Sequence, residues 1–383
     1  MRDDFRWFRR ARYPIYLLLW IQAKLLIRIL GMLPERSHAS SSAHLPQTVL
    51  LVYRNFGNTN QRPLKNLIQN LRDLDSATTI VTRVRFGNTL FGNARWLRLQ
   101  YREVRPSVLL VCDPQLLGLP GIFGLYSLAR FAGVIRRDSA AISLVLFDLP
   151  DPQGALFGAY LLKQKCNVGL MCSTPSEGAQ ILRRQGSGGP LLLATAPVNT
   201  DSAALPIAQR DFCVFLPRPS YEPRRSFVEQ METQLSNHRI SFRVGGGFLR
   251  YDDLQESLNN TQIAVVTNAI ITGATRKWPR PVHLSHHLTY GNIEAISAGC
   301  LLLTEDCEAV RAVFSPGVDC LTFRSPTDAF SQICWVLENP TKAEEIAENG
   351  RSLLSSQSTH LTSTLKSLFL PSRKDEETGA IDG

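Results

Sequence analysis

The chain lacks the closely spaced cysteines of disulfide-bonded or metal-binding domains. Its eight cysteines are scattered between Cys112 and Cys334, and no two of them form a C-x-x-C pair. Most fall inside apolar runs, where cysteine behaves as a small hydrophobic residue. Regular cysteine spacing is typical of secreted disulfide domains, zinc sites and redox motifs. Its absence argues against a disulfide framework and favours a reducing compartment.

Three further absences narrow the function classes. No segment repeats, no interleaved basic and aromatic pattern indicates a nucleic-acid interface, and the triple glycine at 245–247 is not a G-x-G-x-x-G fingerprint. What is present is an ordinary globular composition, 44% hydrophobic and 20% charged, with a net charge of +9. That excess favours anionic partners, such as nucleotide phosphates or a phospholipid surface, and we expect no nucleic-acid partner.

The amino terminus has no uninterrupted apolar run of membrane-spanning length. Residues 1–12 carry five arginines against two aspartates, and the apolar stretch 14–33 is broken by Gln22, Lys24 and Arg28. Basic residues at the centre of a span are costly. We therefore expect residues 1–34 to form a basic amphipathic helix, which holds the chain peripherally on the cytoplasmic face of an anionic membrane surface. A single span and a helix packed on the protein itself are the alternatives.

After a Ser- and His-rich linker at 35–46, apolar runs alternate with helical patterns, as is typical of parallel α/β sheets. Strands are expected at 48–54, 79–84, 108–112, 142–147, 168–171, 191–195, 212–216, 240–244 and 263–267. This pattern predicts an α/β fold with an amino-terminal Rossmann-like domain over 47–200 and a carboxyl-terminal one over 201–370. A hinge is expected near 196–206, and a disordered tail over 371–383.

Polar residues follow several of the expected strands in the first domain. Gly57 and Asn58 follow the first strand, Asp113 follows the third, and Asp148 follows the fourth. Ligands of open parallel sheets lie beyond the carboxyl ends of the strands. These residues are therefore candidates for the amino-terminal side of a cleft, although the same residue types are also common at plain strand ends.

The most informative stretch runs from Tyr290 to Gly350. The segment YGNIEAISAG predicts a short helix that starts in a glycine turn at Gly291 and is closed by Gly299 in a left-handed cap. A helix start presents free backbone amides and a partial positive charge, which suit a phosphate. We expect Glu294 in the first helical turn, where it would accept hydrogen bonds from sugar hydroxyls or simply interact with the helix dipole.

Further pieces follow in order: a buried strand at 300–304, SPGVDCLTF at 315–323, ENP at 338–340 and AENG at 347–350. Together they resemble the donor-binding half of GT-B glycosyltransferases, especially the CgeB-like branch of the glycosyl-transferase group 1 families. The resemblance implies two Rossmann-like domains facing a cleft. It also implies a nucleotide-diphosphate sugar as donor, a saccharide or lipid-linked acceptor of the cell envelope, and no cofactor. Transfer would retain the anomeric configuration and need no metal.

The resemblance implies roles for six donor-site residues. Gly291, Asn292 and Glu294 would contact the donor, with Glu294 on the ribose. Arg218, Arg224 and Arg225 lie where the first strand of the second domain meets its helix. We expect at least one of these arginines to hold the diphosphate, because a fixed guanidinium stabilises a leaving phosphate without a metal.

The chain departs from the pattern at one position. Many retaining members carry a second glutamate eight positions before the residue that matches Glu294, and here that position is His286. Asp113, Asp148 and His286 are the candidates for a catalytic base, and none is singled out. The histidines at 283, 286 and 287 lack a cysteine or carboxylate at ligand spacing, so no metal site is expected. A non-catalytic GT-B-like scaffold and a nucleotide-sugar epimerase are the alternative functions.

Overall fold

A computed structural model of the chain describes residues 48–54, 69, 72, 79–85, 92–106, 108–112, 141–146, 167–171, 191–194, 205–217, 223–245, 251–272, 283–286 and 288–369. The expected membrane helix at 1–34, the linker at 35–46, most of the hinge and the tail at 371–383 lie outside these ranges. Within them, no helix combines the length and the apolar content of a membrane span.

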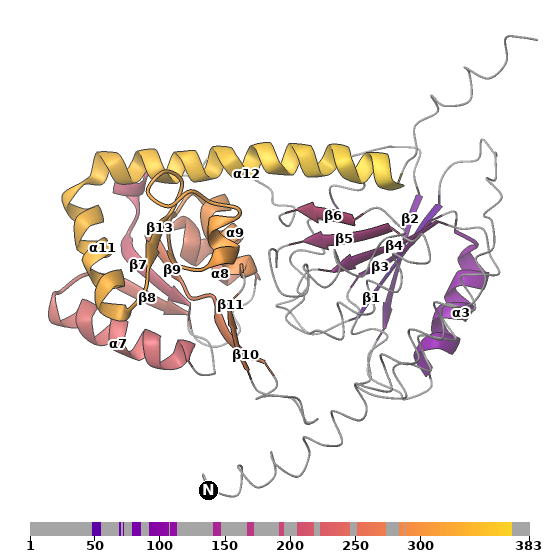
Figure 1. The fold of residues 1–383 in the computed structure, drawn as a ribbon, viewed down its shortest axis with the longest axis horizontal. Coiled ribbons are helices and arrows are strands. Elements are labelled where there is room, and N and C mark those ends of the chain that lie inside the picture. The colour runs from indigo at the N-terminus through magenta and orange to yellow at the C-terminus, as the bar shows by residue number, and fades with distance from the viewer. Residues whose placement is uncertain are drawn as a thin grey trace, which may run out of the picture.

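The first sheet is six-stranded and parallel throughout (Figure 1). It comprises β1 (Thr48–Arg54), β2 (Thr79–Arg85), β3 (Val108–Cys112), β4 (Ala141–Leu146), β5 (Asn167–Met171) and β6 (Leu191–Ala194), in the order β2-β1-β3-β4-β5-β6. The predicted strands are confirmed within one residue. In the middle of β1, Val49, Leu50 and Leu51 are all buried, as expected of a parallel strand covered on both faces.

Helix α3 (Gly92–Val104) follows β2 and was not predicted. Polar residues dominate its sequence, although Leu97, Tyr101 and Val104 recur at helical spacing. Side-chain bonds join it to β2, because Arg83 Nε donates to Gln100 Oε1 at 2.7 Å and Arg83 Nη2 donates to Glu103 Oε1 at 3.0 Å.

The second sheet is five-stranded and parallel, with the order β13-β12-β9-β7-β8. Its strands are β7 (Phe212–Pro217), β8 (Phe242–Gly245), β9 (Thr261–Val266), β12 (Leu301–Glu305) and β13 (Leu321–Phe323). The helices are η2 (Ile207–Gln209), α7 (Arg224–Asn237), α8 (Tyr251–Asn259), α9 (Tyr290–Ser297), α10 (Glu308–Arg311), α11 (Pro326–Glu338) and α12 (Pro340–Phe369). Helix α12 extends from this sheet toward the first one (Figure 1). The α/β fold with two Rossmann-like sheets is thus confirmed.

Alternate residues of the second sheet enter two separate cores. Leu301 and Leu303 of β12 pack with α7 and α11 on one face, whereas Leu302 packs with α8 and α9 on the other. Full burial of such a side chain contributes about 1.5–3 kcal/mol. This two-sided burial explains why the strands appear in the sequence as continuous apolar runs.

Helix α9 begins earlier than predicted. Thr289, in extended conformation, is the N-cap, and the helix starts at Tyr290. The predictions that Gly291 forms a preceding turn and that Glu294 lies in the first helical turn were therefore wrong, since Gly291 is the second helical residue and Glu294 lies one turn inside. The left-handed cap is confirmed, because Gly299 has φ +75°.

A short antiparallel hairpin interrupts the parallel pattern between β9 and α9. It consists of β10 (Ala269–Thr272) and β11 (His283–His286). The sequence did not predict it, because four-residue strands are too short to show periodicity.

The later pieces of the motif lie against one another. Asn349 Nδ2 on α12 donates to the Val318 carbonyl oxygen at 3.0 Å. A Cβ atom at Gly350 would lie 2.5 Å from the carbonyl oxygen of Asp319, so only glycine lets α12 approach the 315–320 loop this closely. Gly317 has φ +83°, which reverses the chain within that loop. The SPGVDC and AENG segments, which lie apart in the sequence, therefore pack against each other in the fold.

Arg210 holds together the edge of the second sheet at which its strands begin. It is 4% exposed, and its guanidinium donates to the carbonyl oxygens of Leu205 at 2.8 Å, Thr261 at 2.8 Å and Ala298 at 3.1 Å. Burial raises the pKa of the neighbouring Cys300 to about 12, so that side chain stays a neutral thiol. These bonds anchor the carboxyl end of α9.

Candidate functional site

The strand order of the second sheet reverses between β7 and β9. The chain passes from β7 to β8 on one side and then returns to β9 on the other. In open parallel sheets, ligands bind beyond the carboxyl ends of the strands at such a switch point. The described residues there are Pro217 at the end of β7, Thr267 and Asn268 after β9, and the start of α9, which is bonded to Asn268.

A buried amide network joins the ends of β9 and β12 to α9. Asn268 Nδ2 donates to Thr304 Oγ1 at 2.8 Å and to the Glu305 carbonyl oxygen at 2.9 Å. Asn292 Nδ2 donates to Asn268 Oδ1 at 2.8 Å, and Thr304 Oγ1 donates to Asn292 Oδ1 at 2.6 Å. Asn268, Asn292 and Thr304 are fully buried. Since a buried polar group that loses its partner costs about 1–3 kcal/mol, the network holds α9 in one position.

Two further contacts complete this network. Asn292 Nδ2 also contacts the carbonyl oxygen and Oγ1 of the N-cap residue Thr289, both at 3.0 Å. The backbone amide of Asn268 donates to Glu305 Oε2 at 2.7 Å. The Asn292 side chain, predicted to contact a donor, is thus engaged inside the protein, and its donor contact stays a prediction.

Gly291 lies at the exposed end of α9. A Cβ atom there would meet Val266 Cγ1 at 3.7 Å and Thr289 Oγ1 at 3.8 Å, which are ordinary contact distances. The fold therefore does not require glycine at this position. Its backbone amide is one of the first in the helix and therefore has no carbonyl partner within it. Glu294, which is 7% exposed, lies one turn further along.

The predicted arginines lie at the start of α7. Arg224 is its first residue and is half-buried. Arg225 Nε donates to Glu229 Oε1 at 2.9 Å, and both side chains are exposed. Exposed pairs of this kind contribute about 1 kcal/mol or less, so a phosphate could draw the guanidinium from Glu229 at small cost. Arg218 lies outside the described residues.

The residues predicted on the amino-terminal side, Gly57, Asn58, Asp113 and Asp148, also lie outside the described residues. The strands that precede them are described, however. Strand β1 lies between β2 and β3, so the strand order of the first sheet reverses there. In the sequence, Gly57 and Asn58 follow β1 and Asp113 follows β3, which are the two strands at that switch point. Their roles stay predictions.

The hairpin brings the backbone of His286 to the edge of the site. His286 pairs with Ala269, which directly follows Asn268 of the network. The position that departs from the family pattern thus lies near the carboxyl end of β9. Across the described ranges, no three His, Cys, Asp or Glu side chains gather in the way a metal ion would require.

Comparison with protein families identifies the second domain. Residues 222–362 match the model of the glycosyl transferase-like family. The match extends from just before α7 into α12, so it includes the amide network, Gly291 and Glu294. A search among curated protein sequences finds no match.

Solved structures resemble the chain over both domains. HepE from Anabaena in complex with UDP is 11% identical, with a TM-score of 0.52 over 84% of this chain and 100% of that one. Sucrose-phosphate synthase from Thermosynechococcus elongatus is 11% identical, with a TM-score of 0.55 over 85% and 100%. A glycosyltransferase from Rickettsia africae is also 11% identical, with a TM-score of 0.53 over 86% and 100%.

These likenesses show the GT-B fold for the chain. The second domain matches a glycosyltransferase family over residues 222–362. The matched region includes the strands and the helix α9 at the switch point of the second sheet. The CgeB-like branch and the roles of the individual site residues stay predictions.

Substitution of Asn292 by alanine tests the network. We expect Asn292→Ala to lower the free energy of unfolding of this domain by about 3 kcal/mol, because Asn268 Oδ1 and Thr304 Oγ1 lose their buried partner. Urea unfolding measures the change. Asn237→Ala, at an exposed position in α7, is the control and should change stability by about 0.5 kcal/mol or less. Equal effects of the two substitutions would contradict the account.

Proposed function

We propose that this chain is a glycosyltransferase that moves a sugar from a nucleotide-diphosphate sugar to a saccharide or lipid-linked acceptor. The observation that carries the proposal is the start of α9, a helix end with Gly291 in its first turn, held by buried bonds at the switch point of a parallel sheet. Such a helix end favours a phosphate through its amides and its dipole. The family match over the same residues supports this assignment.

UDP is the nucleotide to test first. HepE, which shares the fold, has been solved with UDP and with UDP and glucose. In the proposed complex the diphosphate lies near the Gly291 amide, and Glu294 accepts hydrogen bonds from the ribose hydroxyls. Asn292 supports the same end of the helix through its internal bonds.

The proposed chemistry depends on the leaving group. The bond between the anomeric carbon and the diphosphate oxygen breaks, the acceptor hydroxyl oxygen bonds to that carbon, and the hydroxyl proton passes to the leaving diphosphate. One or more of Arg218, Arg224 and Arg225 neutralise the charge that develops on the diphosphate, so the step needs no metal and no cofactor. Retention of configuration follows if the acceptor enters on the face that the diphosphate leaves.

The acceptor side is proposed to lie on the first domain, over residues 47–200. Gly57, Asn58, Asp113 and Asp148 follow its strands, and Asp113, Asp148 and His286 are the candidates for a base if the enzyme inverts instead. The WaaG glycosyltransferase of lipopolysaccharide biosynthesis shares the fold, which supports a cell-envelope acceptor here.

The basic segment 1–34 is proposed to hold the enzyme on the cytoplasmic face of an anionic membrane. Each basic residue near such a surface contributes about 1 kcal/mol. Deletion of residues 1–34 should therefore abolish co-sedimentation with vesicles that contain phosphatidylglycerol. The full chain should bind these vesicles and not neutral phosphatidylcholine ones. Undiminished sedimentation of the truncated chain would contradict the anchor.

Substitution of Gly291 by alanine tests the donor site without a cost in folding. We expect Gly291→Ala to raise the dissociation constant of UDP at least tenfold, because the methyl group would cover the amide that the phosphate approaches. The free energy of unfolding should stay equal or rise by up to about 1 kcal/mol, since alanine has the higher helix propensity. Isothermal titration calorimetry and urea unfolding measure the two quantities.

Glu294→Gln is the companion variant for the ribose contact, and it should also weaken UDP binding. Asn237→Ala is the control, and it should bind UDP with unchanged affinity. Unchanged affinity in both site variants would remove α9 from the donor site. No binding of any nucleoside diphosphate to the full chain would favour the non-catalytic scaffold.

A further inference from the structure

A second polar pocket lies at the carboxyl ends of β12 and β13, on the side of the sheet away from β7. It encloses about 630 Å³ and is lined by residues from the β12–α10 turn, the loop before β13 and the start of α11. Charged and neutral polar side chains dominate the lining: Asp306, Arg311, Ser315, Thr322, Arg324, Asp328 and Gln332. The glycosyltransferase site described above uses none of them.

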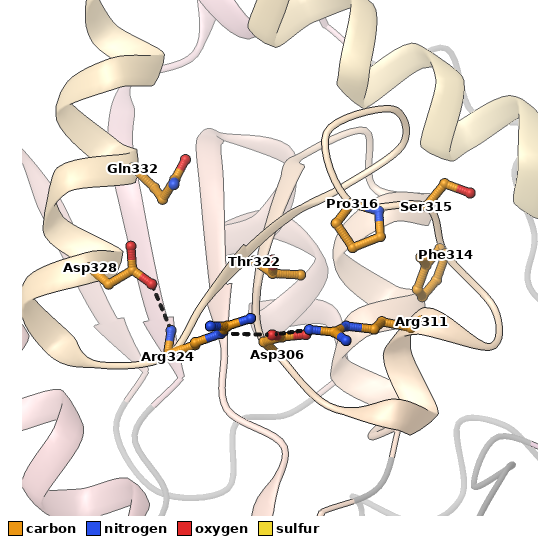
Figure 2. A pocket seen from close by; sticks show the side chains of 9 residues that line it. All are labelled: Asp306, Arg311, Phe314, Ser315, Pro316, Thr322, Arg324, Asp328 and Gln332. Carbon is orange, nitrogen blue, oxygen red and sulfur yellow. Dashed lines mark hydrogen bonds and ion pairs between the residues drawn. The ribbon is translucent and has the colours of Figure 1, made fainter.

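Two arginines share one carboxylate in this pocket. Arg311 Nε donates to Asp306 Oδ1 at 2.7 Å, Arg311 Nη2 donates to Asp306 Oδ2, and Arg324 Nε donates to that second oxygen at 3.0 Å. Figure 2 shows the two guanidinium groups on opposite sides of the Asp306 carboxylate. The Asp306 side chain is only 8% exposed, whereas those of Arg311 and Arg324 are 55% and 76% exposed.

The little-exposed Asp306 carboxylate therefore holds the guanidinium groups of two exposed arginines in place. The paired guanidiniums hold the pKa of Asp306 below its usual range, so it stays ionised at neutral pH. Around Asp306 one negative charge faces two positive ones, and the Asp328 carboxylate, which also lines the pocket, brings the formal charge of the lining to zero. Arg324 uses only Nε for Asp306, which leaves the four N–H bonds of its two terminal nitrogens for another acceptor.

The second carboxylate of the pocket is engaged elsewhere. Asp328 Oδ2 accepts from the backbone amide of Arg324 at 2.8 Å, and the Asp328 amide donates to Ser325 Oγ at 3.1 Å. These bonds cap the first turn of α11, where a carboxylate is also stabilised by the helix dipole. Asp328 thus holds the backbone of Arg324 in place and does not bind its guanidinium.

We propose that this pocket binds the phosphate group of a phosphorylated monosaccharide. A phosphate monoester carries a charge of about −1.5 to −2 at pH 7 and has three strong acceptor oxygens, which suit two guanidiniums fixed on one carboxylate. The volume exceeds that of a phosphate alone, and Ser315, Thr322 and Gln332 supply donors and acceptors for sugar hydroxyls. The ligand class is thus a sugar phosphate, held apart from the nucleotide donor.

Titration calorimetry with the full chain tests this proposal. Glucose 6-phosphate is expected to bind more tightly than inorganic phosphate, and unphosphorylated glucose should give no heat. Arg324→Gln should raise the dissociation constant of glucose 6-phosphate at least tenfold, and Arg324→Lys should give an intermediate value, since lysine keeps the charge and loses the fork of donors. Arg239→Gln removes an exposed guanidinium from the turn after α7 and should leave binding unchanged.

UDP separates this pocket from the donor site. Saturating UDP should not displace glucose 6-phosphate, and Arg324→Gln should bind UDP as the unaltered chain does. Absence of binding by the unaltered chain, equal affinity in Arg324→Gln, or displacement by UDP would each overturn the proposal. Equal affinities for glucose 6-phosphate and inorganic phosphate would overturn its saccharide part. The titrations with glucose 6-phosphate and inorganic phosphate do not depend on whether the donor site binds UDP.

Discussion

The buried bonds among Asn268, Asn292 and Thr304 are the constraint on which the rest of the site depends. They join side chains from three segments that are separated in the sequence, and no water needs to complete them. A helix end binds an anion well only if its backbone amides already point toward the anion site in the unbound protein, because ordering them during binding would lower the affinity. Here the alignment is established by folding, and the amide of Gly291 lies at the end that the network fixes.

The opposite end of α9 is fixed by a different kind of interaction. Arg210 is buried and donates to backbone carbonyl oxygens from the chain before β7, the start of β9 and the end of α9. Neutral asparagines thus hold the amino-terminal end of α9, and a buried cation holds its carboxyl-terminal end. Asn349 and Gly350 of α12 pack against the 315–320 loop at another edge of the same domain. Several separate contacts therefore fix α9 and this loop in the second domain.

Parts of this arrangement were predictable from the sequence. The strands of both sheets appear as apolar runs because they are buried on both faces, and Gly299 was predictable as a left-handed cap because Cys300 starts a new apolar run directly after it. The start of α9 was placed too late, since Thr289 is the N-cap although its side chain makes no capping bond. The hairpin at 269–286 and the pocket around Asp306 could not be predicted. Both depend on which distant residues the fold brings together, and short strands and single arginines leave no periodic signal.

Hydrogen–deuterium exchange of the full chain, with and without UDP, tests the central claim most directly. The first amides of a helix have no carbonyl partner within it and exchange readily, so a phosphate bound there should slow them. The account predicts that peptides covering residues 289–294 gain protection when UDP is added, while peptides covering 306–324 do not change. Protection confined to other segments, with none at 289–294, would contradict it.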